Sequence, residues 1–124
     1  MTNLQNLING VRVEATSGEM SDVLNPATGQ VIARVPLSTT ADVELAVSAA
    51  QDAFETWSRT PVPKRARVLF HYWQLLQAHE HELAELITQE NGKSYKEALG
   101  EVLRGIECVE FAAGSPSHLM GATL

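Results

Sequence analysis

The spacing of apolar residues changes near Thr40, and this change constrains the fold more than any other feature of the sequence. From there on, apolar side chains recur every three or four residues, which places them on one face of a helix. Thr39 or Thr40 can accept hydrogen bonds from the free N–H groups of its first turn, and Asp42 and Glu44 suit the positive end of its dipole. The apolar face consists of Val43, Ala46, Val47, Ala50, Ala53, Phe54 and Trp57.

Two pairs of short strands are predicted before this helix. Asn9-Gly10 stands between two apolar, β-prone pairs, a pattern typical of a hairpin. Within residues 22–36, Pro26 and Gly29 mark a turn between two further strand-like runs. The part of the chain before Thr40 should therefore consist of short antiparallel strands and turns.

Three more helices are predicted to follow the first. Residues 58–63 end the first helix, and Pro63 is acceptable in the opening turn of the second. The third helix runs from about Glu80 to Glu90 and ends at Asn91-Gly92, where glycine is free to adopt the left-handed conformation. The fourth spans Ser94 to Ala113, before Gly114 and Pro116 interrupt the pattern.

These helices present more apolar surface than four short strands could cover. A chain of 124 residues can bury one core but is too short for a two-domain enzyme. Because a helix must bury its apolar face against another element, the uncovered faces are compatible with a truncated domain. The predicted fold is α+β and mainly helical, with short N-terminal antiparallel strands and about four helices.

The composition excludes several classes of function. The net charge of −6 and the nine Lys and Arg residues argue against a nucleic-acid-binding surface. No apolar run approaches the ~20 residues of a membrane span, and the N-terminus resembles neither a secretory signal nor a transit peptide. The lone cysteine, Cys108, excludes an internal disulfide and suits a reducing compartment. We therefore expect a soluble, cytoplasmic protein that binds neither nucleic acid nor membrane.

Several side chains suggest chemistry but have a simpler structural interpretation. Cys108 lies in the middle of a helix with no base beside it, which favours a packed structural thiol over a nucleophile. His79-Glu80-His81-Glu82 lacks the i, i+4 spacing of a zinc motif, so polarity at a helix junction is favoured. The glycines of the fourth helix do not follow a strand and form no phosphate loop. Four aromatic residues at helical spacing are expected in the core: Phe54, Trp57, Phe70 and Trp73.

Several stretches of the sequence resemble the aldehyde dehydrogenase superfamily in order and spacing. Leu7-Ile8-Asn9-Gly10 is similar to the opening hairpin of that superfamily, and residues 24–36 resemble its next strand pair. Glu90-Asn91-Gly92-Lys93, with residues 96–102 after it, resembles the Glu-x-Gly-Lys segment and the helix that follows it. The resemblance covers almost the whole chain. It implies an α/β parent with a Rossmann-like NAD-binding domain, of which residues 1–124 would be an incomplete N-terminal portion without the catalytic domain.

Residues 63–70 and 104–114 resemble, within this superfamily, the CoA-acylating methylmalonate-semialdehyde dehydrogenases. Members of that family oxidise malonate or methylmalonate semialdehyde with NAD through a thioester on a cysteine. Decarboxylation accompanies the reaction, and CoA takes the acyl group as acetyl-CoA or propionyl-CoA. The resemblance implies that the nucleophilic cysteine, the oxyanion-stabilising asparagine and the NAD-binding strands lie after Leu124. Residues 1–124 alone should therefore bind no cofactor and be inactive.

Arg104 is the predicted binding residue for the substrate carboxylate. A guanidinium offers two parallel donors that match a carboxylate, and a semialdehyde that carries one needs such a partner to be oriented. Periodicity alone favours an ordinary arginine paired with Glu101 or Glu107, whereas the family likeness favours the substrate role. On its helix Arg104 shares one face with Gly100, Cys108 and Phe111.

Two other interpretations remain open at this point. A different aldehyde dehydrogenase, acting on another semialdehyde without CoA, would share most of these segments. Alternatively, the chain is a non-enzymatic helical interaction module whose apolar faces are covered by a partner or an oligomer. For the parent enzyme, the resemblance implies a homo-oligomer, a tetramer, in which the remainder of the subunit is the partner of this segment.

Overall fold

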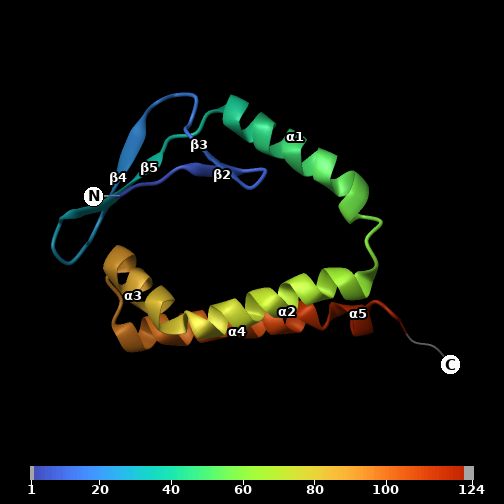
Figure 1. Cartoon of the computed structure of the whole chain (residues 1–124). Helices are drawn as coiled ribbons and strands as arrows, with labels where there is room; N and C mark the ends of the chain where they lie inside the picture. Colours follow the sequence, from blue (N-terminus) through green and yellow to red (C-terminus); the bar gives the residue numbers. More distant parts are fainter. Residues whose placement is uncertain (1, 122–124) are drawn as a thin grey trace. The chain divides into compact units, whose positions relative to one another are not determined.

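The computed structural model describes residues 2–121, which divide into two units between Arg59 and Thr60 (Figure 1). Among these residues, the N-terminal unit contains short strands followed by one long helix, and the C-terminal unit contains helices. The order of elements confirms the predicted α+β class, with strands first and helices after them.

The predicted hairpin is formed by β2 (Asn6–Ile8) and β3 (Val11–Val13). Between them, Asn9 and Gly10 have positive φ angles of 51° and 75°. A two-residue turn of type I′ requires this conformation, which asparagine and glycine adopt most readily. The strands pair antiparallel with Ile8 opposite Val11, so the Asn-Gly turn sets the register of the hairpin.

The second predicted strand pair is also present, as part of a three-stranded sheet. β4 (Met20–Leu24) pairs antiparallel with β5 (Val31–Pro36). A third strand, β1 (Thr2–Asn3), pairs parallel with β5 and gives the order β1-β5-β4. The sequence did not predict β1, because two polar residues carry no alternation of apolar and polar side chains.

The first helix, α1 (Thr40–Trp57), is capped by Thr39, one of the two predicted cap residues. Its apolar face is only partly covered within the N-terminal unit. The hairpin approaches the helix near Ala46 and Ala50, whereas Phe54 is 65% exposed and Trp57 is 44% exposed. The prediction that these two aromatic residues belong to a core is therefore wrong for this unit. The helical period identifies an apolar face but does not supply the element that covers it.

The C-terminal unit contains the three other predicted helices and one short addition. They are α2 (Val62–Ala78), α3 (Glu80–Asn91), α4 (Tyr95–Ala113) and α5 (Ser115–His118). Pro63 lies in the first turn of α2, and α3 ends at Gly92 with a φ of 79°, as predicted. Ser94 caps α4, one residue before the helix begins. Helix boundaries in this unit therefore follow the proline, glycine and serine signals of the sequence.

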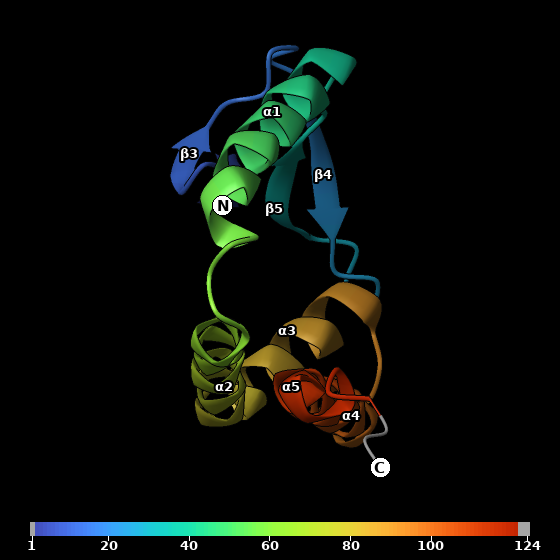
Figure 2. The ribbon, with the colours of Figure 1, turned by 90° about the vertical axis from the view of Figure 1, so that its right-hand side faces the viewer.

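The core of the C-terminal unit lies where α4 packs against both α2 and α3 (Figures 1 and 2). Trp73, predicted as a core residue, packs against this core although it is only half-buried. Phe70 on α2 is 47% exposed, so its predicted place in the core is wrong for this unit. No large side chain among the described residues is fully buried. The buried residues of this cluster are Ala84, Ala98, Val102 and Ile106.

Candidate functional site

Helix α4 has two faces with different environments. Ala98, Val102 and Ile106 are buried against α2 and α3. Arg104 lies two residues from Val102 and from Ile106, which turns its side chain to the opposite side of the helix. The predicted grouping of Arg104 with Cys108 and Phe111 agrees with this arrangement, since all three residues are exposed on this side. We call this side, from Gly100 to Phe111, the open face of α4.

Arg104 has no ion pair or hydrogen bond among residues 2–121. Glu101, one of its two alternative partners, instead forms an ion pair with Lys93. Glu107, the other, is exposed. The guanidinium therefore keeps all of its donors available for an acceptor from outside the described residues. Binding of a substrate carboxylate by Arg104 stays a prediction on these grounds.

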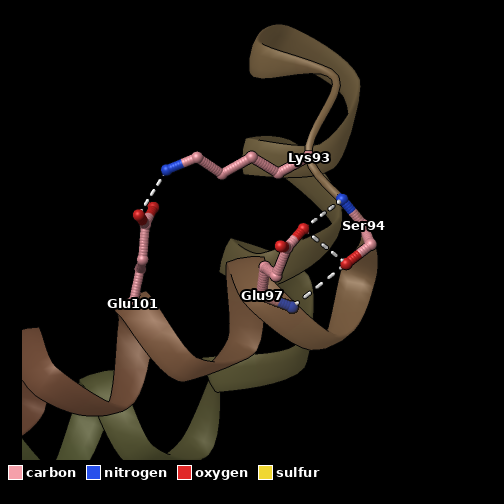
Figure 3. A network of polar contacts seen from close by, with 4 residues as sticks. All are labelled: Lys93, Ser94, Glu97 and Glu101. Carbon is pink, nitrogen blue, oxygen red and sulfur yellow. Dashed lines mark hydrogen bonds and ion pairs between the residues drawn. The ribbon is translucent and has the colours of Figure 1, made fainter.

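The start of α4 is fixed by a polar network around Ser94 (Figure 3). The Ser94 hydroxyl donates to Oε2 of Glu97 at 2.7 Å, and the Ser94 backbone N–H donates to the same oxygen at 3.3 Å. The Glu97 N–H in turn donates to the Ser94 hydroxyl at 3.4 Å, which completes a capping box. The hydrogen bond from the Ser94 hydroxyl, then that from its N–H, and the nearby Lys93 lower the pKa of Glu97.

The Lys93–Glu101 ion pair is a second polar contact at this end of the helix (Figure 3). Lys93 belongs to the link between α3 and α4, and Glu101 lies on the second turn of α4. The capping box fixes the first turn of α4, and the ion pair joins the link after α3 to the second turn of α4. They position the helix that carries Arg104, and the sequence motif Glu90 to Lys93 marks this place.

Cys108 is exposed, so the prediction of a packed structural thiol is wrong for the part of the chain that the structure describes. The physical reason is its place on the open face of α4, one turn after Arg104 and away from the buried Ile106. No group of three or more His, Cys, Asp or Glu side chains that could hold a metal ion occurs among residues 2–121.

The histidines of the His79 to Glu82 run have polar partners of their own. The Nδ1 of His79 lies 2.9 Å from Oε2 of Glu82, at the junction of α2 and α3. The Nδ1 of His81 lies 2.6 Å from the hydroxyl of Tyr95, and the two rings are stacked. These contacts tie the junction and the start of α4 together, and both histidines are exposed, as the surface interpretation predicted.

A buried carboxylate holds the N-terminus of α1, and only part of this arrangement is visible in the sequence. Asp42 is 4% exposed and accepts hydrogen bonds from two threonines. The N–H groups of Thr39 and Thr16 donate to it at 2.7 and 3.0 Å, and both hydroxyls lie at 3.0 Å. These bonds lower the pKa of Asp42, the Thr39 N–H being the largest cause. The spacing from Thr39 indicates a cap, but nothing in the sequence predicts the bond to Thr16.

An apolar groove of about 480 Å³ runs along the C-terminal unit and was not predicted as a feature. Gly105 is at its edge, and a Cβ built there meets no atom within 4 Å; the same is true at Gly100 on the open face. A mid-helix glycine costs about 1 kcal/mol relative to alanine. Contacts within residues 2–121 explain neither glycine. The groove is lined mainly by Tyr72, Leu76, Leu83, Ile87, Val102 and Ile106.

No helix among residues 2–121 combines the length and the apolar character needed to cross a membrane.

The profile of the aldehyde dehydrogenase family matches residues 13–124. The chain is 65% identical over 121 residues to a malonate-semialdehyde dehydrogenase 2 of Bacillus cereus, covering 98% of this chain and 25% of the relative. It is 61% identical, over the same shares, to the malonate-semialdehyde dehydrogenase of Halalkalibacterium halodurans. The chain thus spans about a quarter of the length of the curated relatives it matches.

Solved structures of methylmalonate-semialdehyde dehydrogenases are similar to this chain in both sequence and fold. The methylmalonate-semialdehyde dehydrogenase of Oceanimonas doudoroffii is 47% identical with a TM-score of 0.88, and the match covers 94% of this chain and 24% of that one. A Sinorhizobium meliloti 1021 protein, assigned as a methylmalonate-semialdehyde dehydrogenase and solved with NAD, is 42% identical with a TM-score of 0.87. That match covers 93% of this chain and 23% of the solved one.

Proposed function

The chain belongs to the aldehyde dehydrogenase family, and we propose that it is the N-terminal portion of the NAD-binding domain of a CoA-acylating malonate- or methylmalonate-semialdehyde dehydrogenase. The observation that carries the proposal is the identity of 60–65% to malonate-semialdehyde dehydrogenases over 98% of the chain. The catalytic domain is not part of residues 1–124 in this proposal. The complete enzyme would yield acetyl-CoA or propionyl-CoA in the cytoplasm.

Arg104 would bind the carboxylate of the semialdehyde in this enzyme. The support is its place on the open face of α4, where it forms no ion pair with Glu101 or Glu107. The capping box at Ser94 and the Lys93–Glu101 pair would hold the helix in place while the substrate binds (Figure 3). A bidentate guanidinium fixes the direction of a carboxylate as well as its position, and so orients the aldehyde group at the other end of the substrate.

We propose that NAD binds outside the described residues, which lack one form of dinucleotide cradle. Such a cradle needs a glycine-rich turn between a strand and the helix after it, where backbone N–H groups can approach a pyrophosphate. The turn from β5 to α1 contains Leu37, Ser38 and Thr39, and no glycine. NAD, which accepts the hydride in this chemistry, would therefore be held by other parts of the enzyme. The role of this segment is to bind substrate and to support the fold.

The remainder of the subunit would cover the apolar surface of this segment. Phe54 and Trp57 on α1 and the groove between α2, α3 and α4 are apolar surfaces that a stable monomer seldom leaves exposed. The same surfaces also favour a second candidate, a non-enzymatic helical module that associates with a partner. The proposed enzyme would form a homo-oligomer, and a tetramer is its proposed state.

An activity assay separates these candidates. The complete enzyme should produce NADH from malonate semialdehyde and NAD, with a rate that depends on CoA, whereas the 124-residue chain alone should produce none. Acyl-CoA formation, measured by mass spectrometry, distinguishes the acylating enzyme from one that releases a free acid. NADH formation by the 124-residue chain, or turnover by the complete enzyme without any acyl-CoA product, would contradict the proposal.

A further inference from the structure

We propose that Asn9, at the tip of the β2–β3 hairpin, is a site of spontaneous deamidation, while the second Asn-Gly pair, Asn91-Gly92, is protected by the fold. Asparagine is among the thermolabile residues of proteins. The reaction is fastest when glycine follows, because glycine has no side chain to hinder approach of its backbone nitrogen to the asparagine amide. The chain contains this pair twice, in two different structural settings.

The turn at Asn9 leaves the reacting groups accessible. Both Asn9 and Gly10 are exposed, and both lie in the two-residue loop between β2 and β3. A Cβ built on Gly10 meets no atom within 4 Å, so nothing packs against this side of the turn. Within residues 2–121, the N–H of Gly10 is not among the donors of turn or loop hydrogen bonds. The nitrogen that must attack is therefore neither covered nor tied to an acceptor.

The same groups are restrained at Asn91. Asn91 is the last residue of α3, and the N–H of Gly92 donates to the carbonyl oxygen of Thr88 at 3.0 Å. Attack by the Gly92 nitrogen would require this helix-ending hydrogen bond to break and the end of α3 to unwind. The helix end is further held by the link to α4, where Lys93 pairs with Glu101 (Figure 3). Asn91 should therefore react only from a locally opened state.

The reaction balances without a cofactor. The backbone nitrogen of Gly10 forms a bond to the side-chain carbonyl carbon of Asn9 and loses its proton, and the bond from that carbon to Nδ2 breaks. The released group takes up the proton and leaves as ammonia, which gives a five-membered succinimide. Water then opens either carbonyl of the ring and forms aspartate or isoaspartate.

The products would change the hairpin in two ways. Aspartate places a negative charge at the exposed turn of a chain whose net charge is already −6. Isoaspartate routes the backbone through the former side chain and lengthens it within the turn. A type I′ turn has two central residues of fixed geometry, so the longer backbone disturbs the pairing of Ile8 with Val11.

The test compares each site in the folded and in the denatured chain. The 124-residue protein is incubated in mildly alkaline buffer, with and without denaturant, and peptides that contain residue 9 or residue 91 are followed by mass spectrometry. Replacement of the amide NH₂ by OH gives the mass change, and an isoaspartyl methyltransferase detects the isoaspartate. We expect Asn9 to react at nearly the same rate in both states, and Asn91 to react at least about tenfold more slowly when folded.

Internal controls come from the other asparagines. Asn6 precedes Leu7, whose side chain hinders the attack, and should stay intact over the period in which Asn9 reacts. The variant Asn9→Gln should lose the product at residue 9, because the corresponding ring has six members and closes slowly. Equal protection of Asn9 and Asn91 by the fold, or faster reaction of Asn91 in the folded chain, would overturn the proposal.

Discussion

The two faces of α4 differ in burial, because one is packed into a core and the other is exposed. One face packs Ala98, Val102 and Ile106 into the core of the C-terminal unit. The other carries Arg104, Cys108 and Phe111, all of them exposed; Phe111 is 70% exposed although its ring lies 4.8 Å from that of His118 on α5. The contrast shows that apolar character alone does not tell which side of a helix is a core. It also separates residues that stabilise this unit from residues that would serve the complete enzyme.

The largest expected effect is on the buried face. Ile106→Ala should destabilise the C-terminal unit by about 2–4 kcal/mol, because it removes buried methyl groups and leaves a cavity. Urea denaturation followed by circular dichroism measures the loss. Leu103→Ala, outside the buried face of α4 and 43% exposed, is the matched control and should cost much less. If both substitutions cost the same, the distinction between the two faces is wrong.

Substitution of Gly105 tests whether the groove is uncovered in the 124-residue chain. Gly105→Ala should stabilise the 124-residue chain by about 0.5–1 kcal/mol, since alanine favours the helix and its Cβ meets no atom. Gly92→Ala should have the opposite sign, because its φ of 79° strains any residue with a Cβ. Thermal unfolding of both variants is the measurement. Destabilisation by Gly105→Ala would show that the groove is filled within this chain.

Acid should weaken the capping box at the N-terminus of α4, the helix that carries both faces. The folded pKa of Glu97 lies below its ordinary value of 4.5, so the unfolded chain binds the proton first as the pH falls. The contribution of Glu97 to the free energy of unfolding is therefore complete above its ordinary pKa of 4.5. It is lost as the pH falls below about 4.5, until the carboxyl of the folded chain is protonated as well. The melting temperature should fall less steeply with acid in Glu97→Gln than in the natural chain. Identical pH profiles would exclude a role for the capping box.

The smallest expected effect concerns Cys108. If the open face is uncovered in the 124-residue chain, a thiol reagent should modify Cys108 almost as fast in buffer as in denaturant. In the complete enzyme, where we propose that the remainder of the subunit lies nearby, the modification should slow. Strong protection of the thiol in the short chain would place Cys108 on a covered face.

The local elements of the fold could be predicted from the sequence because their signals are local. Asn9-Gly10 requires positive φ angles, Gly92 ends α3, and Ser94 caps α4 within one residue of the expected start. The strand β1 escaped prediction because Thr2 and Asn3 pair with β5 through distant backbone groups. Such pairing leaves no pattern in two polar residues.

Burial and long-range polar contacts were the parts that the sequence could not supply. The carboxylate of Asp42 binds Thr16 across 26 positions of the chain, and no spacing rule reaches that far. Phe54 was assigned to a core from its helical spacing, and Cys108 to a packed position because no base was expected beside it, yet both are exposed. Helical spacing reports which side of a helix is apolar, whereas burial depends on elements elsewhere. Arg104 was singled out by the family likeness, since spacing alone favoured an ordinary surface ion pair.

The account depends most directly on the contact between Arg104 and a substrate carboxylate, which steady-state kinetics of the complete enzyme can test. Arg104→Gln should raise the KM for malonate semialdehyde at least about tenfold, as expected for the loss of a charge-assisted hydrogen bond of about 1.5–3 kcal/mol. Its kinetics with propanal, which lacks the carboxylate, should stay unchanged, as should those of the exposed control Lys96→Gln with either substrate. An unchanged KM for the semialdehyde, or an equal loss with propanal, would contradict the assignment.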